Sequence, residues 1–216
     1  MPIAASKPRA GKWISDGKPH PGRRMTEAEF VAWVDEDTLA EWVDGKVVIM
    51  PPVSDEHDDW GWWLRSVFQG FVDHFELGRV KGPEFMVRLR NQRRRRLPDV
   101  LFVSKARLEI IRKNHVEGSP DLIIEVVSPE SVPRDWQEKY LEYERAGVRE
   151  YWLIDRAAGH FMVYRLGTNG RYKAVPEVDG KVSSKVISGF YLRTKWVLGD
   201  KRPNVFAALR ELGVKF

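Results

Sequence analysis

Length, composition and charge exclude several classes of protein. The chain has 216 residues, of which 43% are hydrophobic and 31% charged, a mixture typical of one globular domain with or without a tail. It has no cysteine, which excludes disulfides, thiolate metal sites and cysteine nucleophiles, so a metal ion would need oxygen or imidazole ligands. No apolar stretch is long enough to span a membrane, and the N-terminus lacks the apolar run of a signal peptide. We therefore expect a cytoplasmic protein without a membrane partner.

The formal net charge of +5 resides entirely in the first 24 residues. This segment holds six Lys and Arg against Asp16 alone and is rich in proline, so it is predicted to be a basic flexible arm ahead of a single domain over residues 25–216. Within the domain, acids gather at residues 35–59, whereas Arg88, Arg90 and Arg93–Arg96 form a basic stretch. Such segregation favours a cation site beside a track for phosphates. A solvated hairpin turn is the simpler alternative for the arginines.

The first predicted elements are a helix, a strand and a second helix. A capping box and an apolar face predict a helix over Thr26–Asp35, and a following helical turn is predicted to carry Glu41. Gly45–Met50 is β-rich and is followed by two prolines, which predicts a short strand. A long helix is predicted from about Glu56, because large apolar residues then recur at steps of three and four.

A β-hairpin follows, in which the alternating run Phe85–Leu89 and the apolar run Leu97–Val103 are predicted strands and the arginines form the turn. A short helical piece is predicted at residues 106–113. Asp121–Ser128 (DLIIEVVS) has the apolar continuity of a buried strand.

The next helix, Pro133–Ala146, is predicted to end at Gly147, and Tyr151–Asp155 is a further strand. Strand, helix and strand at this spacing predict a right-handed crossover between two parallel strands. Additional strands are predicted at residues 160–166, 171–175 and 181–188, with a closing helix at 203–212. The predicted fold is α/β, with a mixed central sheet flanked by helices.

Two acids, Asp99 in LPDVLFV and Glu125 in DLIIEVV, lie inside strands that are otherwise apolar. A buried carboxylate without a partner is costly, so each needs a cation nearby. Two such carboxylates on adjacent strands would suit Mg²⁺ or Mn²⁺, which take oxygen ligands. The alternative is that both acids lie at strand ends and reach solvent.

These motifs resemble the PD-(D/E)xK nuclease superfamily, whose core is a restriction-endonuclease-like fold. More closely, the sequence over Met25–Leu166 is similar to the bacterial Uma family of restriction-endonuclease-like proteins. The shared motifs occur in order and are EWVDGKVVIMPP, a His at the start of a helix, LPDVLFV, PDLIIEVVSPES, RDWQEKYLEYERAGVREYW and LID.

The resemblance implies that Asp99 and Glu125 are the metal-binding carboxylates, assisted by a backbone carbonyl next to Glu125, and that Glu41 is the upstream acid of the superfamily. This sequence departs from the superfamily at Val127, where a Lys is expected. The resemblance implies that Lys139, on the next helix, takes its place. Trp136 and Tyr143 lie three and four residues from Lys139, which predicts that all three share a sheet-facing stripe.

Other polar residues have two interpretations each. His57 could assist at the rim of a metal site or could be an ordinary polar residue at a helix N-terminus. Asp121 could be a third carboxylate or could begin its strand. Trp60, Trp62 and Trp63 cannot all face one core, so one of them could lie at a homodimer contact.

The leading functional hypothesis is a Mg²⁺- or Mn²⁺-dependent endonuclease that hydrolyses DNA phosphodiester bonds. Asp99 and Glu125 would hold the metal, Lys139 would orient or deprotonate the attacking water, and Glu41 would assist. Arg93–Arg96 and the arm would contact the DNA backbone. The main alternative is an inactive protein of the same fold that binds nucleic acid or regulates a partner, and Val127 supports it. A dimeric structural or regulatory partner is a third hypothesis, based on the many aromatic residues.

Overall fold

The computed structural model describes residues 14–15, 18–19, 24–35, 38–50, 52, 54–89, 92–129 and 131–216. The predicted arm over residues 1–24 lies mostly outside the described residues. Within it, β1 (Ile14–Ser15) and β2 (Lys18–Pro19) pair antiparallel. The flexible arm and its boundary with the domain therefore stay predictions.

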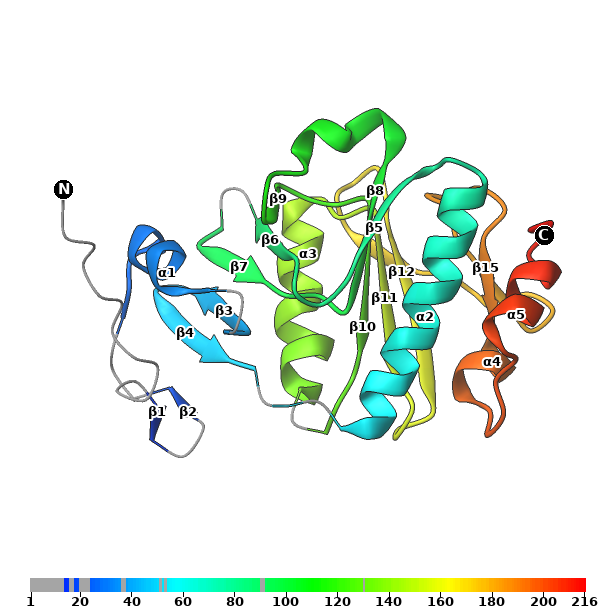
Figure 1. The fold of residues 1–216 in the computed structure, drawn as a ribbon, viewed down its shortest axis with the longest axis horizontal. Coiled ribbons are helices and arrows are strands. Elements are labelled where there is room, and N and C mark those ends of the chain that lie inside the picture. Colours follow the sequence, from blue (N-terminus) through cyan, green and yellow to red (C-terminus); the bar gives the residue numbers. More distant parts are fainter. Residues whose placement is uncertain are drawn as a thin grey trace.

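A six-stranded mixed sheet forms the centre of the molecule (Figure 1), in the order β13-β12-β11-β10-β8-β5. Its strands are β5 (Gly78–Lys81), β8 (Val100–Ser104), β10 (Leu122–Val126), β11 (Glu150–Asp155), β12 (His160–Leu166) and β13 (Tyr172–Ala174). β10 and β11 are parallel, which confirms the predicted crossover, and the other neighbours are antiparallel. The α/β prediction is thereby confirmed.

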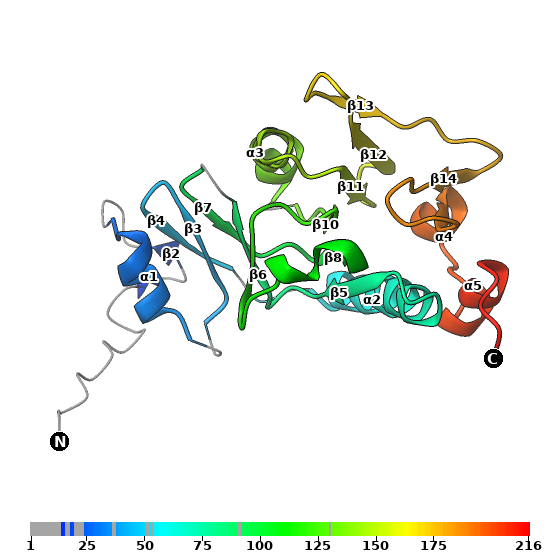
Figure 2. The ribbon, with the colours of Figure 1, turned by 90° about the horizontal axis from the view of Figure 1, so that it is seen from above.

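Helices cover both faces of this sheet. α2 (Asp55–His74), α4 (Thr194–Leu198) and α5 (Val205–Glu211) pack on one face. The π-helical η3 (Arg134–Lys139) and the continuing α3 (Tyr140–Ala146) pack on the other, and Figure 2 shows α2 and α3 on opposite sides of β10. Alternation along β10 sends Ile124 toward α2 and Ile123 toward α3. Glu125 continues the Ile123 face, so its carboxylate lies on the side of α3.

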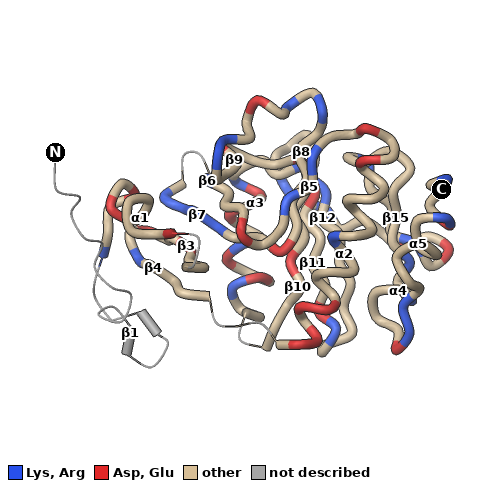
Figure 3. Tube along the Cα trace, in the orientation of Figure 1, with Lys and Arg blue, Asp and Glu red and all other residues tan. Residues whose placement is uncertain are grey.

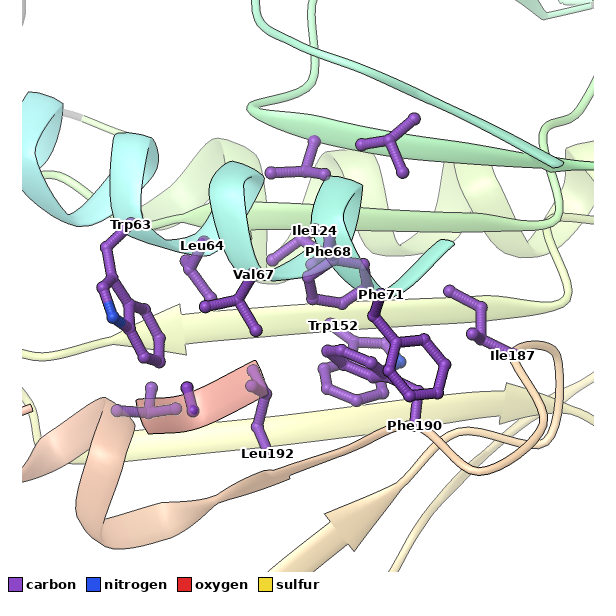
Figure 4. Close-up of a cluster of buried hydrophobic side chains, with 14 of the residues drawn as sticks. Trp63, Leu64, Val67, Phe68, Phe71, Ile124, Trp152, Ile187, Phe190 and Leu192 are labelled. Atoms are coloured by element: carbon purple, nitrogen blue, oxygen red, sulfur yellow. The ribbon is translucent and has the colours of Figure 1, made fainter. Parts of the chain in front are cut away.

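The core beneath α2 explains why the long helix was predictable. Its large apolar side chains recur at helical spacing and meet those of the sheet and the C-terminal segment (Figure 4). The Phe68 ring lies 4.2 Å from that of Phe190 and 5.9 Å from that of Trp152, measured between centroids. Trp62 is on the opposite side of the helix and is 63% exposed. The predicted homodimer contact stays a prediction.

A smaller five-stranded sheet, in the order β4-β3-β7-β6-β9, lies beside the first. Its strands are β3 (Ala40–Val43), β4 (Lys46–Ile49), β6 (Met86–Leu89), β7 (Arg94–Arg96) and β9 (His115–Glu117). α1 (Glu27–Trp33) begins at the predicted capping box, in which the side chain of Thr26 accepts from the backbone N–H of Glu29 and the side chain of Glu29 accepts from the backbone N–H of Thr26. The helix buries Phe30 against this sheet. The prediction that Glu41 lies in a helical turn was wrong, because Glu41 is on β3.

The predicted hairpin was also assigned incorrectly. Arg94–Arg96 form strand β7, which pairs with β6 and with β3, and only Arg93 lies in the turn before it. The chain then crosses at Leu97–Asp99 into the large sheet, where β8 pairs with β10 and β5. Three consecutive arginines form an internal strand here because acidic side chains surround them, as described below.

The remaining elements are short. η2 (Lys105–Ile110) is a 3₁₀ helix in the predicted helical piece, and β14 (Lys181–Ser183) pairs antiparallel with β15 (Tyr191–Arg193). α5 confirms the predicted closing helix. Within the ranges that the structure describes, no helix combines the length and apolarity required to cross a membrane.

Candidate active site

The ammonium of Lys139 lies inside a cluster of carboxylates. Its Nζ is 2.8 Å from Oε2 of Glu125, 3.1 Å from Oδ1 of Asp135 and 3.8 Å from Oε1 of Glu41. The residue is only 1% exposed. Burial by itself would lower the pKa of Lys139, but the charges of these carboxylates outweigh burial and raise the pKa above its ordinary value. Lys139 is therefore a protonated, charge-compensating group.

The helix that carries Lys139 explains its inward position. Asp135 lies four residues earlier in the π-helical segment, and Tyr143 lies four residues later in α3. Lys139 and Tyr143 are buried, as the predicted stripe requires, whereas Trp136, its third member, is only partly buried. Asp135, which was not predicted to belong to the stripe, is also buried. Gly147 ends the helix with a φ of 84°, in the left-handed region that glycine favours. π-helical turns occur often at functional sites.

Glu125 has a partner for each of its carboxylate oxygens. Lys139 contacts Oε2, and the hydroxyl of Tyr143 donates to Oε1 at 2.8 Å. Burial raises the pKa of Glu125 to about 8, and the charges of Asp135 and Asp99 act in the same direction, against that of Lys139. Glu125 therefore retains a high affinity for a proton or another cation.

Asp99 lies at the beginning of β8, beside the end of β10. Its Oδ2 accepts a hydrogen bond of 2.7 Å from the backbone N–H of Val126. Burial raises the pKa of Asp99, although the side chain keeps 17% exposure. Asp99 thus forms the solvent-facing edge of the cluster.

His57 joins this edge from the first turn of α2. Its Nε2 lies 2.9 Å from the backbone oxygen of Val126 and 3.7 Å from Oδ2 of Asp99. Its backbone N–H donates to the N-cap side chain of Ser54. Both interpretations of His57 therefore have a structural basis, since it lies at a helix N-terminus and also contacts the rim of the site.

Glu41 connects the small sheet to this cluster. Its Oε2 accepts from Nη1 of Arg96 at 2.7 Å, and its Oε1 accepts from the backbone N–H of Leu97 at 3.1 Å. Arg96 is 1% exposed and donates twice more to Glu142, at 2.8 and 2.7 Å. Burial would raise the pKa of Glu41, but the charges of Lys139 and Arg96 dominate and lower it. Glu41 is thus held as a carboxylate by one cation from each side.

The arginines of β7 are used mainly inside the protein. Arg95 is buried and donates to Glu27 at 2.8 Å, and Arg94 donates to Glu142 at 2.8 Å. The assignment of Arg95 and Arg96 to DNA contact is therefore corrected, because carboxylates already hold these buried guanidinium groups. Arg93 is exposed beside the ring of Trp42, and Arg94 is partly exposed. Contact with DNA stays a prediction for these two.

Sequence reasoning missed two members of the cluster. Asp135 could have been found, because an acid four residues before a lysine on a helix is a known pairing distance. The partner of Arg96, Glu142, has no comparable signal, since these residues are 46 positions apart. Val127, which occupies the position where the superfamily pattern has a lysine, is buried among apolar side chains.

Asp121 belongs to a different set of contacts. Its Oδ1 pairs with Arg107 at 2.8 Å and with Arg149 at 3.1 Å, and its Oδ2 accepts from the backbone N–H of Ser104. Asp121 immediately precedes β10 and fixes the beginning of that strand, which is the second of its two interpretations.

The donor set suits a hard divalent cation at Asp99 and Glu125. Both carboxylates have a raised pKa, and the charge of Asp99 contributes to that of Glu125, so a cation near both would relieve an unfavourable concentration of charge. Mg²⁺ is commonly held by one or two carboxylates with waters completing its shell. Among the described residues, no group of three or more Asp, Glu or His is arranged to hold a metal ion.

Comparisons with known proteins agree with this architecture. The Uma2 family model, described as "Putative restriction endonuclease", matches residues 27–194. The crystal structure of "a putative nuclease belonging to DUF820" from Anabaena variabilis is similar, with a TM-score of 0.67 and 21% identity, covering 86% of this chain and 99% of that chain. This likeness shows a common restriction-endonuclease-like fold. A search of curated proteins finds no match.

Proposed function

This chain belongs to the Uma2 family, whose model is described as "Putative restriction endonuclease", and from that membership we propose that it is a metal-dependent endonuclease acting on DNA. The observation that carries the proposal is the ammonium of Lys139 at 2.8 Å from Glu125. A lysine beside a metal-binding carboxylate is what the superfamily pattern requires, and here a helix supplies it where the strand has Val127.

In this proposal Asp99 and Glu125 hold Mg²⁺ or Mn²⁺. The ion would polarise the phosphate and lower the pKa of a bound water, which is the usual contribution of a metal to phosphodiester hydrolysis. The carboxylate of Asp99 is partly exposed to solvent. A metal bound by Glu125 would compete with Tyr143 and Lys139, which already contact its two carboxylate oxygens.

Lys139 acts in this proposal as a donor and a positive charge. Because its pKa is raised, it holds its proton near neutral pH and does not serve as the general base. Its ammonium would donate a hydrogen bond to the attacking water or to a phosphate oxygen and stabilise the negative charge that develops on the phosphate. Glu41 and Asp135 orient the ammonium through their contacts at 3.8 and 3.1 Å.

Metal binding provides the first test. Titration calorimetry with Mn²⁺ should detect binding to the wild-type chain, and Asp99→Ala and Glu125→Ala should each abolish it. Asp73→Ala, which removes an exposed acid from α2, is a matched control that should bind normally. Unchanged Mn²⁺ affinity in both site variants would remove the metal site from the proposal.

Nicking of supercoiled plasmid DNA in Mn²⁺ separates this proposal from the inactive alternative. That alternative is favoured by one observation, namely that both oxygens of Glu125 already have protein partners. An active nuclease should convert the plasmid to open circles, and Asp99→Ala should not. A wild-type chain that binds Mn²⁺ and DNA but leaves the plasmid intact would support a nucleic-acid-binding module.

A further inference from the structure

A hollow of about 490 Å³ lies between α2 and β5, outside the carboxylate cluster. Its walls include Trp62, Arg65 and Gln69 from α2, and Lys81 and Gly82 from the end of β5. None of its lining residues is acidic. The hollow therefore combines an aromatic ring, the guanidinium of Arg65 and polar groups without an acidic residue on its walls, whereas the ammonium of Lys81 lies over the ring of Phe85, 4.9 Å from its centroid.

Trp62 differs from the two tryptophans beside it. Trp60 is buried and contacts the guanidinium groups of Arg156 and Arg202, which lie 4.0 and 4.5 Å from its ring centroid. Trp63 donates its indole N–H to the backbone oxygen of Pro203. Trp62 is 63% exposed, and no described residue gives it a ring contact or a hydrogen bond. Its indole is thus available to a planar ligand.

Arg65 differs in the same way from the arginines of β7. It is half-buried, yet among the described residues it has no ion pair or hydrogen bond. Its side chain lies across Gly82, where a Cβ would approach Cδ of Arg65 to 3.1 Å and Nη1 to 3.3 Å. A guanidinium held against the backbone without a carboxylate suits an anionic oxygen, and arginine forms strong charge-assisted hydrogen bonds with phosphate.

Both elements that line the hollow also have residues near Asp99. Lys81 pairs in register with Leu101, two residues after Asp99 along β8, which is about 7 Å of strand. Trp62 follows His57 by five residues on α2, which is about 7.5 Å of helix, and His57 contacts Asp99. Figure 3 shows positively charged positions on β5 and α2. Because the hollow lies on the α2 face and Glu125 on the α3 face, a strand lying in the hollow would meet the cluster at its Asp99 edge.

We propose that this hollow binds a nucleotide of single-stranded DNA, with its base stacked on Trp62 and its phosphate on Arg65. The inference rests on the proposed nuclease function and narrows its substrate to DNA with an unpaired segment beside the scissile bond. A duplex keeps its bases stacked on one another, so only an unpaired base can cover the indole. Base stacking on aromatic side chains is a common way to bind single strands without sequence preference.

The test is equilibrium binding in EDTA, where metal-dependent cleavage cannot interfere. The probes are a labelled oligothymidylate of twelve nucleotides and a labelled abasic strand with the same number of phosphates. Trp62→Ala should weaken oligothymidylate binding about tenfold, the scale of one lost base stack, and should leave abasic binding unchanged. Arg65→Gln should weaken both probes and reduce the salt slope by about 0.7.

Matched controls lie on α5. Phe206→Ala removes an aromatic residue that is 61% exposed, and Arg210→Gln removes an exposed cation, so both should bind both probes normally. Equal wild-type affinity for the two probes, or normal binding by Trp62→Ala and Arg65→Gln, would overturn the inference. If the wild-type chain does not nick the plasmid but binds oligothymidylate in a Trp62-dependent way, the nuclease function is rejected and the hollow remains a DNA-binding site.

Discussion

Replacing Lys139 with Met tests the carboxylate cluster most directly. Methionine keeps an unbranched stem of similar length and removes the charge that faces Glu125, Asp135 and Glu41 at 2.8, 3.1 and 3.8 Å. These acids are each no more than 2% exposed, so water cannot replace the ammonium. The substitution should therefore destabilise the metal-free protein as well as impair its chemistry.

The expected loss of stability follows from the burial of the pair. Removing one partner of a buried ion pair costs about 3–5 kcal/mol, because the other charge stays desolvated. That is a large fraction of the roughly 5–15 kcal/mol that holds a typical domain together. For a chain of this size the melting temperature should fall by roughly 6–20 °C. Nuclease activity should fall about 100-fold or more.

Urea and thermal unfolding in EDTA would measure the destabilisation, and plasmid nicking would measure the activity. Lys105→Met is the matched control, because the ion pair of Lys105 with Glu76 is exposed and should contribute less than about 1 kcal/mol. The double variant Lys139→Met/Glu125→Gln removes one uncompensated carboxylate as well. It should recover about 1–3 kcal/mol relative to Lys139→Met alone.

Three results would each refute a part of this reasoning. If Lys139→Met is as stable as Lys105→Met, the ammonium does not compensate the buried carboxylates. If the double variant is less stable than Lys139→Met, the destabilisation comes from lost packing of the side chain. A wild-type nicking rate in Lys139→Met would remove the residue from the proposed mechanism.

Three further predictions concern other parts of the chain. Deletion of residues 1–24 should weaken non-specific DNA binding and make its salt slope shallower by up to about five, and an unaltered slope would mean that the arm does not contact DNA. Gly78→Ala should cost about 1–3 kcal/mol or more in urea unfolding, because a Cβ would lie 2.2 Å from the backbone oxygen of Val103; unchanged stability would contradict that close approach. The hydrogen bond from Arg88 lowers the pKa of Glu27, so the stabilisation it provides is complete above the ordinary pKa of 4.5 and is lost as the pH falls through the lower folded-state value. Glu27→Gln should therefore be less stable than wild type at neutral pH, and the difference should shrink as the pH falls below 4.5 in urea titrations, whereas a pH-independent difference would exclude this linkage.

The elements that the sequence predicted correctly have local signals. Thr26 and Glu29 form a capping box within four residues, and the apolar continuity of DLIIEVV indicates a strand covered on both faces. Glu41 and β7 were assigned incorrectly because their environment is not local. The partners that neutralise Arg96 are 46 and 55 positions away, so nothing near Arg94–Arg96 distinguishes a buried strand from an exposed turn.

The candidate site was predictable to a similar extent. Resemblance and strand position identified Asp99 and Glu125, and helical periodicity identified the inward face of Lys139. The structure brings Lys139 to Glu125 and Glu41, while the catalytic roles of all four residues stay predictions. The hydroxyl of Tyr143 was not anticipated, because helical spacing marks a tyrosine as apolar and cannot indicate which carboxylate its hydroxyl meets.

The link from Arg96 to Glu142 has a consequence for biosynthesis. A growing chain that has emerged only through β8 contains Glu41 and Arg96, but it lacks Lys139 and the second carboxylate that Arg96 requires. The carboxylate cluster can assemble only after η3 and α3 have been translated and have packed against both sheets. Fragments that end before α3 would therefore lack the complete cluster, including the ammonium that compensates Glu41.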